Sequence, residues 1–241
     1  MKIVTLNTWG TEGPYEKRWR LLLEELTRLN PEVICFQEAF DPELVEQIQK
    51  TLGFPNTLIS LRSGLAIVTK FELSSEKTLA FETQSPTEPY VREAILAVLN
   101  TGKNEFVAAN THLAWKSEDA PVRLGQVKEL MEAVKEGKQD VILAGDFNDT
   151  PESPAIQELK RAGFRDVYDL CHPAGSEVTW DNRNPFIQTH SVKFPDRRID
   201  FLFLSEALAK KSKPKKCEIV FNRADGEGIY PSDHYGVMAE I

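Results

Sequence analysis

The chain has 241 residues, of which 37 are acidic and 29 basic, so its formal net charge is −8. This acidic excess disfavours a charge-driven, sequence-independent grip on nucleic acid by the protein as a whole. The length suffices for a large core and no Gly/Ser-rich linker divides the chain, so we expect one domain over residues 1–241. One lysine-rich segment could form a local basic patch, although a solvated loop after a short helix is the simpler interpretation. It comprises Lys210, Lys211, Lys213, Lys215 and Lys216.

The three cysteines, Cys35, Cys171 and Cys217, lie far apart and form no CxxC pair. This spacing argues against a disulfide framework or a zinc knuckle and fits a reducing compartment. The N-terminal apolar run is too short for a signal peptide, and no stretch approaches transmembrane length. We therefore predict a soluble cytoplasmic protein without a transmembrane segment, and we infer no obligate protein partner.

The first third of the chain alternates apolar strands with amphipathic helices. A strand over residues 2–6 ends at Asn7, and a helix whose apolar residues fall at helical spacing runs to residue 29. A fully apolar strand at 33–36 follows. A second helix over 42–52 starts at a proline and stops at a glycine, as helices commonly do.

The middle of the chain is rich in β-structure. We expect strands at 64–69, 79–82, 92–100 and 105–112, with a hairpin turn at 101–104. Apolar residues occupy both odd and even positions of 94–99, which predicts a sheet covered on both faces.

A helix from beyond Trp115 to Gly137 then leads into an apolar strand at 141–144, which Gly145 is expected to break. The inward face of that helix would carry Leu124, Val127, Leu130, Met131 and Val134. The last part predicts a helix near 154–162, with Asp149 or Thr150 as the cap of a helix that begins near Pro151 or Pro154. Loop-rich sequence and two strands at 199–204 and 235–241 follow.

Polar residues gather where the predicted strands end or begin. Asn7, Glu38, His112 and Asp146 lie at strand ends, with Asn148 two residues further on, whereas Asp200, Asp233 and His234 lie where strands begin. Strands that run in opposite directions would bring these positions to one rim of a mixed sheet. The order strand, helix, strand, acid also occurs twice, which favours two related halves, although such units recur in any α/β protein.

So many carboxylates on one rim would raise each other's pKa unless a cation neutralised them. Oxygen donors from Glu38, Asp146 and Asp233, without thiolates, suit Mg²⁺ or Mn²⁺ better than Zn²⁺. Because Mg²⁺ is usually held by one or two carboxylates together with substrate phosphate, the set implies phosphoester chemistry. His234 is the best candidate for acid/base work, with Asp200 or Asp233 fixing its tautomer.

Each of these residues has a plainer interpretation when it is taken alone. Asn7, Glu38 or His112 could be a cap or a solvated rim residue, and Asp200 could pair with Arg197 or Arg198. Their joint placement at successive strand ends favours a functional site.

Six short motifs run through nearly the whole chain in a fixed order. They are Leu6-Asn7, Gln37-Glu38, Thr111-His112-Leu113, Gly145-Asp146-Phe147-Asn148, Arg198-Ile199-Asp200 and Ser232-Asp233-His234. In this order they resemble the motifs of the endonuclease/exonuclease/phosphatase superfamily of metal-dependent phosphoesterases. The resemblance implies a four-layer α/β sandwich of the DNase I-like kind, in which two mixed β-sheets pack face to face with helices outside.

The resemblance also implies roles for the site residues. Glu38 would hold a catalytic Mg²⁺ (or Mn²⁺), with Asn7 beside it and Asp233 near a metal. Asp146 and Asn148 would position the attacking water and the phosphate, and His112 would bind a phosphate oxygen. Asp200 would orient His234, which would act as a base or stabilise developing charge. Whether Asp146 or His234 activates the water stays open.

The implied reaction is divalent-metal-dependent hydrolysis of a phosphodiester or phosphomonoester bond by in-line attack of an oriented water. The substrate would be a nucleic acid, a small-molecule phosphoester or a lipid headgroup. Trp9 and Trp180 are candidate substrate-binding residues, because an indole near the rim could stack on a base or cover a sugar or lipid. Packing against the sheet is the plainer interpretation for Trp9 and for Trp115.

Two alternatives stay open. Thr179-Trp180-Asp181 and the segment 231–236 are also similar to 5′-tyrosyl-DNA phosphodiesterases, which makes such an activity, or a DNA-end-processing nuclease, the first alternative. The other is a non-catalytic binding module on the same scaffold, which loss of a rim residue would have indicated.

Overall fold

The computed structural model describes residues 1–135 and 139–241. Within these residues, twelve strands form two sheets. The first sheet contains β1 (Lys2–Asn7), β2 (Val33–Gln37), β3 (Asn56–Ser60), β4 (Leu65–Thr69), β11 (Lys216–Val220) and β12 (Gly236–Glu240). The second contains β5 (Glu72–Ala80), β6 (Glu93–Asn100), β7 (Glu105–His112), β8 (Asp140–Asp146), β9 (Phe164–Asp166) and β10 (Asp200–Ser205).

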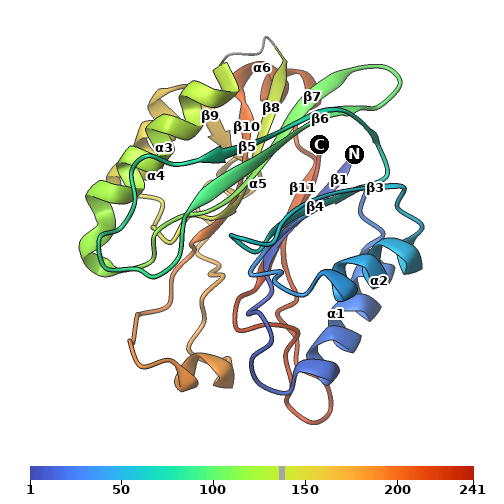
Figure 1. The fold of residues 1–241 in the computed structure, drawn as a ribbon, viewed down its shortest axis with the longest axis vertical. Helices are drawn as coiled ribbons and strands as arrows, with labels where there is room; N and C mark the ends of the chain where they lie inside the picture. Colours follow the sequence, from blue (N-terminus) through green and yellow to red (C-terminus); the bar gives the residue numbers. More distant parts are fainter. Residues whose placement is uncertain (136–138) are drawn as a thin grey trace.

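The helices cover the outer faces of the two sheets (Figure 1). Helices α1 (Tyr15–Leu29) and α2 (Pro42–Leu52) lie on the first sheet, and α3 (Ala120–Lys135) and α4 (Pro154–Arg161) lie on the second. Two shorter helices, α5 (Val167–Cys171) and α6 (Glu206–Ser212), flank β10. The arrangement is the predicted four-layer α/β sandwich, with two mixed sheets packed face to face.

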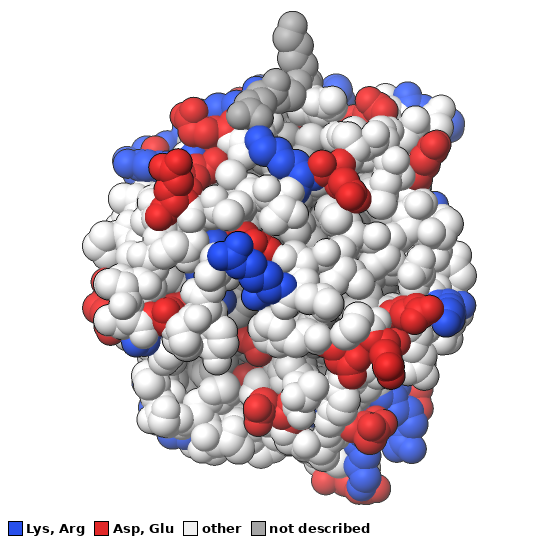
Figure 2. Space-filling view, viewed as in Figure 1, with Lys and Arg blue, Asp and Glu red and all other residues white. Residues whose placement is uncertain are grey.

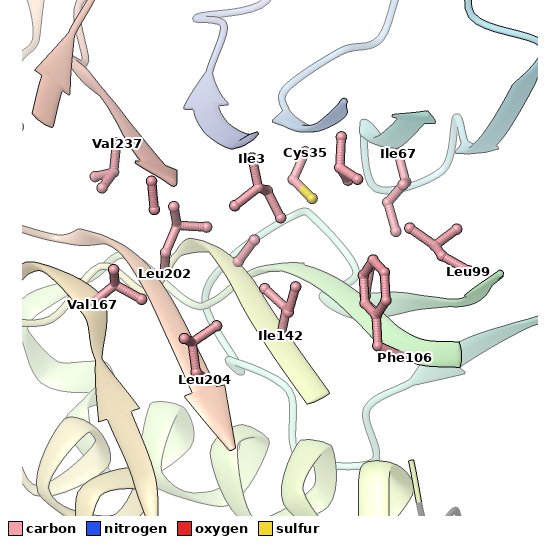
Figure 3. Close-up of a cluster of buried hydrophobic side chains, with 14 of the residues drawn as sticks. Ile3, Cys35, Ile67, Leu99, Phe106, Ile142, Val167, Leu202, Leu204 and Val237 are labelled. Atoms are coloured by element: carbon pink, nitrogen blue, oxygen red, sulfur yellow. The ribbon is translucent and has the colours of Figure 1, made fainter. Parts of the chain in front are cut away.

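Three apolar layers hold the sandwich together. Between the sheets, the inward side chains of both meet in one buried cluster that includes Ile3, Cys35, Ile67 and Ile142 (Figure 3). A second cluster joins the first sheet to α1 and α2, and a third joins the second sheet to α3 and α4. Both faces of the central strands are therefore buried, as the apolar residues at odd and even positions predicted.

The two sheets have matching topology. In the first, the order is β11-β12-β1-β2-β4-β3, and in the second it is β5-β6-β7-β8-β10-β9. Each contains one parallel pair, β1–β2 or β7–β8, and the strands on either side of that pair are antiparallel to it. Helix α1 connects the first parallel pair and α3 connects the second. The strand–helix–strand repeat seen in the sequence is thus the centre of each half.

Several elements differ from the sequence-based expectation. The sequence did not predict strands β3, β9 and β11 or helix α5. β5 begins at Glu72 rather than at residue 79, and the prediction missed its first part because the side chains there are mostly polar and exposed. Leu124 of α3 is half-buried rather than buried, and the helix end expected at Gly137 lies outside the described residues.

The expected cap of α4 was also wrong. Ser153 caps this helix by accepting a hydrogen bond from the Ile156 amide, whereas Asp149 accepts one from Arg123 Nε at 3.0 Å. The predicted strand break at Gly145 was wrong as well, since β8 continues through it to Asp146.

The surface is mixed in charge. On the face shown in Figure 2, Lys and Arg side chains lie interspersed with Asp and Glu. Lys210 pairs with Glu206, Lys211 with Asp140 and Lys216 with Glu218, so these lysines of the basic segment have acidic neighbours of their own. All three cysteines are free thiols. Over residues 1–135 and 139–241, no helix is long and apolar enough to cross a membrane.

Candidate active site

Strand register explains why the polar residues meet. Asn7 is level with Gln37, the residue before Glu38, across the parallel pair β1–β2. His112 is level with Asp146 across β7–β8, and Asp146 is level with Asp200 across the antiparallel pair β8–β10. The ends of four strands and the beginning of a fifth therefore share one rim of the sandwich, as predicted.

At this rim the two sheets enclose a cavity of about 380 Å³. All but one of the predicted site residues line it: Asn7, Trp9, Glu38, His112, Asp146, Asn148, Trp180, Asp233 and His234. Asp200 is fully buried beside the cavity, where its Oδ2 lies 3.0 Å from His234 Nδ1. The volume is in the range of sites for small ligands or for one end of a larger one.

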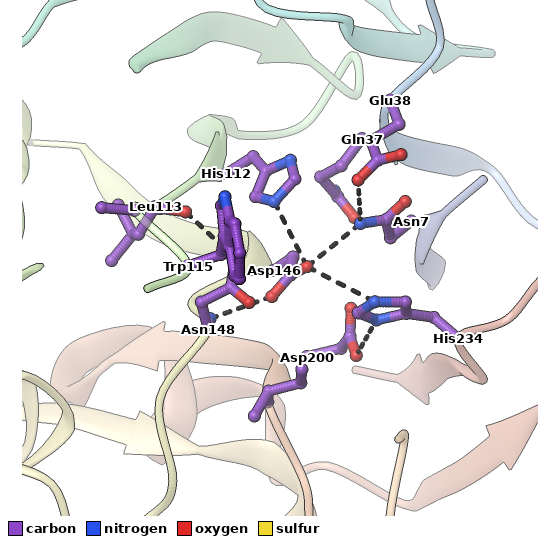
Figure 4. A network of polar contacts seen from close by, with 12 residues as sticks. Asn7, Gln37, Glu38, His112, Leu113, Trp115, Asp146, Asn148, Asp200 and His234 are labelled. Atoms are coloured by element: carbon purple, nitrogen blue, oxygen red, sulfur yellow. Dashed lines mark hydrogen bonds and ion pairs between the residues drawn. The ribbon is translucent and has the colours of Figure 1, made fainter. Parts of the chain in front are cut away.

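Asp146 is the centre of the polar network (Figure 4). Its Oδ2 accepts a hydrogen bond from Asn7 Nδ2 at 3.0 Å and lies 3.4 Å from His112 Nε2 and 3.8 Å from His234 Nε2. Asn7 Nδ2 also donates to Glu38 Oε1 at 3.1 Å. One carboxylate thus contacts an amide and two imidazoles that come from both sheets.

Local backbone geometry orients Asp146. Gly145 has φ +147°, and a Cβ there would lie 2.1 Å from the Thr111 carbonyl oxygen, so only glycine lets β8 pack this closely on β7. Asn148 adopts a left-handed conformation with φ 51°. Its amide donates to Asp146 Oδ1 at 2.9 Å, and its Nδ2 donates to the Leu113 carbonyl at 3.0 Å. Gly145, Asp146 and Asn148 therefore form one positioned unit.

A buried amide pair fixes the spacing of the two sheets behind the cavity. Gln37 Nε2 donates to Asn110 Oδ1 at 2.7 Å, and Asn110 Nδ2 donates to the carbonyls of Phe36 and Ala66. Gln37 directly precedes Glu38, and Asn110 lies two residues before His112. This network, in which most polar groups are satisfied, therefore sets how far apart the two functional side chains lie.

A buried arginine holds the loop after β1, in which the backbone adopts left-handed conformations. The guanidinium of Arg18 donates to the carbonyls of Thr8, Trp9, Gly10, Glu12 and Pro231. It also lies 4.9 Å from the centroid of the Trp9 ring, which stacks on Phe186. Trp9 is thus a packed residue with one edge in the cavity, which combines the two interpretations that its position allowed.

Burial and mutual charge shift the pKa values of the site. Burial and Asp200 raise the pKa of Asp146 to about 7, and burial and Asp233 raise that of Glu38. Burial alone would lower the pKa of His234, but Asp200, Asp146 and Asp233 together raise it to about 10. Burial, Arg92 and His234 hold the pKa of His112 well below its usual value. The site therefore holds an imidazolium, a neutral imidazole and carboxylates that a cation would relieve.

His190, which the sequence did not single out, belongs to the same site. It lies in the long loop between α5 and β10, which also contains the 3-10 helix Pro185–Thr189 and extends below the sheets in Figure 1. His190 Nε2 lies 2.8 Å from Asp233 Oδ2, while Asp233 Oδ1 accepts from the Ser232 hydroxyl and the His234 amide. Burial raises the pKa of Asp233, but His234, His190 and Ser232 outweigh it and hold this pKa below its usual value.

The donor set fits a hard divalent cation. Asp146, Asp200 and His234 each offer one ligand atom within 4.8 Å of the others, and the buried Asp200 Oδ1 has no hydrogen-bond partner among the described residues. Glu38 presents a further carboxylate to the cavity. Asn7 turns its amide nitrogen toward Glu38 and Asp146, because its Oδ1 accepts the Trp9 amide at 3.0 Å. Carboxylate oxygens dominate, as in sites for Mg²⁺ or Mn²⁺.

Comparison with known proteins identifies the family. The sequence profile described as "Endonuclease/Exonuclease/phosphatase family" matches residues 4–234, which is nearly the whole chain. The chain belongs to the endonuclease/exonuclease/phosphatase family. This family membership, together with the complete set of rim residues, identifies the protein as a phosphoester hydrolase.

Curated relatives of this family share limited identity with the chain. Protein angel of Drosophila melanogaster is 29% identical over 93% of the chain and 71% of its own length. Tyrosyl-DNA phosphodiesterase 2 of Mus musculus is 23% identical over 100% of the chain and 66% of its own length. Carbon catabolite repressor protein 4 homolog 3 of Arabidopsis thaliana is 29% identical over 61% of the chain, which spans only 36% of that relative.

Solved structures of the same family share the fold. The structure of D. rerio TDP2 complexed with single strand DNA product has a TM-score of 0.81 and 21% identity, and the match covers 99% of the chain and 97% of that structure. The human Nocturnin catalytic domain with bound sulfate anion has a TM-score of 0.75 and 18% identity over 99% of the chain and 93% of that structure.

Several residues that line the cavity carried no clear signal in the sequence. Besides His190, they are Phe40, Arg62, Tyr90, Arg92, Phe194 and Arg197. Most of them lie in loops away from the strand ends, where periodicity gives no information. Among them, Arg197 is the residue that the sequence could have indicated, because it directly precedes the Arg198-Ile199-Asp200 motif.

Proposed function

We propose that the protein is a divalent-metal-dependent phosphoesterase that hydrolyses phosphodiester bonds by in-line attack of an oriented water. The observation that carries the proposal is the meeting of Glu38, Asp146, Asp200 and His234 at one cavity, joined by Asn7 and His112. The whole of residues 1–241 would act as one catalytic domain.

Glu38 is the residue that would hold Mg²⁺ or Mn²⁺, with Asp233 next to it on the acidic side of the cavity. The bound cation would polarise a phosphoryl oxygen and neutralise developing charge. Asn7 holds Glu38 and Asp146 in place through its amide nitrogen, which donates to both carboxylates. Its proposed part is therefore to orient the metal-binding carboxylate.

Asp146 would orient the attacking water and receive its proton, because its carboxylate lines the cavity and burial and Asp200 raise its pKa to about 7. His234 has its Nδ1 engaged by Asp200, so its Nε2 is left to stabilise charge on the phosphoryl oxygens. His112 and Asn148 would complete the phosphate contacts. Oriented donors of this kind contribute mainly by stabilising the transition state.

The substrate that we propose is an end of a nucleic-acid strand. Among the described residues, the large hydrophobic side chains that are most exposed are Phe40, Leu61, Tyr90, Leu170 and Val192. Phe40, Tyr90 and Val192 line the cavity, and Leu61 adjoins Arg62, which does too. Exposed rings beside a phosphoester site are suited to stacking on bases. Tyrosyl-DNA phosphodiesterase 2, the relative whose name states a DNA substrate, supports this class.

The first experiment measures hydrolysis of bis(p-nitrophenyl) phosphate by the purified chain. We expect EDTA to abolish turnover and Mg²⁺ or Mn²⁺ to restore it, and we expect Asp146→Ala and His234→Ala to lose it. Unchanged activity in either variant would contradict the proposal. Binding of a ligand without turnover under any metal would support the alternative of a non-catalytic binding module.

A substrate panel then separates the phosphoester classes. It contains abasic, 3′-blocked and 5′-tyrosyl DNA, RNA, sphingomyelin and inositol phosphates. Preference for a DNA or RNA end supports the proposed class, and the 5′-tyrosyl arm tests the tyrosyl-DNA phosphodiesterase alternative. Preference for sphingomyelin or inositol phosphates would overturn the nucleic-acid assignment and leave the hydrolase intact. The cytoplasmic location stays a prediction.

A further inference from the structure

Arg197 lies in the wall of the cavity and is tied to the catalytic histidine by backbone contacts. Its amide donates to the Trp180 carbonyl at 3.0 Å, and the Trp180 amide donates to its carbonyl at 2.9 Å. Trp180 forms a second bridge with His234. The segment that carries Arg197 is therefore fixed relative to His234 on one side and to Asp200, three residues further along the chain, on the other.

The guanidinium of Arg197 has no hydrogen-bond or ion-pair partner within residues 1–135 and 139–241. Its Nε is buried without a hydrogen bond, and the side chain makes no hydrogen bond or ion pair with any residue of the described ranges. It is held instead by stacking, with Cζ 3.8 Å from the Phe194 ring centroid and 5.8 Å from the Trp180 ring centroid. Burial lowers the pKa of Arg197, which reflects the cost of leaving this cation desolvated.

The other buried or half-buried arginines all have hydrogen-bond partners among the described residues: Arg18 donates to five backbone carbonyls, and the rest bond carboxylates. Arg198, its neighbour, bonds Asp166 at 2.7 Å and Asp169 at 2.8 Å. Arg92 bonds Glu88 at 2.8 Å, and Arg123 bonds Asp149 at 3.0 Å. Arg197, half-buried in a ligand cavity with free N–H donors, is thus an exception to this pairing. Its guanidinium is suited to bind an anion from outside the protein.

Each carboxylate near Arg197 already has another partner, although one oxygen of Asp200, Oδ1, has none among the described residues. Asp146 and Asp200 both act favourably on its charge, yet Asp146 is held by Asn7 and Asn148, and Asp200 by His234. Asp149, the third carboxylate nearby, is held by Arg123. The donors of Arg197 therefore stay available, while these carboxylates keep the cation attracted toward the reacting centre.

We propose that Arg197 is a substrate-binding residue that holds a non-bridging oxygen of the scissile phosphoryl group. This inference rests on the proposed phosphoesterase function. A guanidinium presents its N–H donors in a planar fork that matches phosphate oxygens, and the aromatic faces of Phe194 and Trp180 fix the plane of that fork. Arg197 thereby gives the phosphate a positively charged contact from the protein, in addition to the contact that the metal cation would supply.

The test compares Arg197→Gln and Arg197→Lys with Arg161→Gln, which removes the same charge from an exposed site on α4. With bis(p-nitrophenyl) phosphate and saturating Mg²⁺, we expect kcat/KM to fall about 100-fold in Arg197→Gln and about 10-fold in Arg197→Lys. Arg161→Gln should stay within about twofold, because its charge is screened by solvent. A fall of less than threefold in the kcat/KM of Arg197→Gln, or an equal fall in Arg197→Gln and Arg161→Gln, would overturn the inference.

A binding measurement separates this inference from the proposed function. The Nε–H signal of Arg197 in the wild-type protein is followed by NMR as inorganic phosphate is added, with Arg197→Lys identifying the signal. We expect a saturable shift of this signal. If the wild-type protein hydrolyses no phosphoester but the signal shifts, the hydrolase proposal fails and Arg197 still binds phosphate. If turnover is normal and the signal does not move, the assignment of Arg197 is wrong.

Discussion

Replacing Asp200 by asparagine should disable His234 without disturbing the shape of the site. Asp200 Oδ2 lies 3.0 Å from His234 Nδ1, and of the three carboxylates that raise the pKa of this histidine to about 10, Asp200 acts most strongly. Loss of that charge removes the largest favourable contribution to the imidazolium form. We therefore expect the pKa of His234 in the metal-free variant to lie below the wild-type value of about 10.

The effect on turnover should be larger than the effect on charge alone. An asparagine can present its NH₂ to Nδ1, where it repels the imidazolium and turns it away from the phosphate, and loss of one such oriented donor costs about 10²- to 10³-fold in kcat. The assay combines ¹⁵N-edited NMR titration of His234 in EDTA with kcat for bis(p-nitrophenyl) phosphate in Mg²⁺. An unchanged pKa together with a kcat within threefold of the wild-type value would refute the reasoning.

Three further results are expected. Gly145→Ala should cost about 3 kcal/mol or more in urea unfolding, because its Cβ would lie 2.1 Å from the Thr111 carbonyl oxygen, and a wild-type midpoint would contradict this close packing. Ser153→Ala should lower the free energy of unfolding by about 1 kcal/mol through loss of the α4 cap and leave kcat unchanged. A urea midpoint equal to that of the wild type would mean that the cap is dispensable. In EDTA, the pKa of His234 is raised from 6.5 to about 10, so its stabilising effect is complete below about pH 6.5 and is lost as pH rises toward 10. Wild-type Tm should therefore fall across this window more steeply than that of His234→Gln, and parallel curves would argue against the pairing.

The sequence was most informative where strands are fully apolar and end in polar residues. The strands that end at Asn7, His112 and Asp146 are buried on both faces, so apolar residues dominate them and the polar residues at their ends are easily seen. Because parallel neighbours end at the same rim and an antiparallel strand begins there, the position of each side chain along its strand sufficed to predict that they meet. The cavity lined by these residues follows from that register.

The sequence was least informative for exposed strands and for loops. β5 has mostly exposed, polar side chains, so it has no apolar pattern to recognise. His190 and Arg197 reach the cavity through tertiary contacts of a long loop, with Asp233 for the first and with Phe194 and Trp180 for the second. No spacing rule encodes such contacts.

The helix cap shows a different limit of sequence reasoning. Asp149, Thr150 and Ser153 are all residues that favour caps, and composition alone does not choose between them. Ser153 is the cap because it directly precedes Pro154, the first residue of α4, whereas Asp149 lies in the preceding loop and is engaged by Arg123 of α3. The residue at which the helix begins, which composition does not give, thus decides the cap.

The central claim is that one metal-dependent site at this rim hydrolyses phosphodiesters. The most direct measurement is the rate of bis(p-nitrophenyl) phosphate hydrolysis by EDTA-stripped protein as Mg²⁺ is added, for the wild type and for Glu38→Gln. We expect the wild-type rate to rise from background to saturation and the variant to need at least about tenfold more Mg²⁺ for half of its maximal rate. Turnover that is independent of Mg²⁺ and Mn²⁺, or identical metal titrations for the two proteins, would contradict the account.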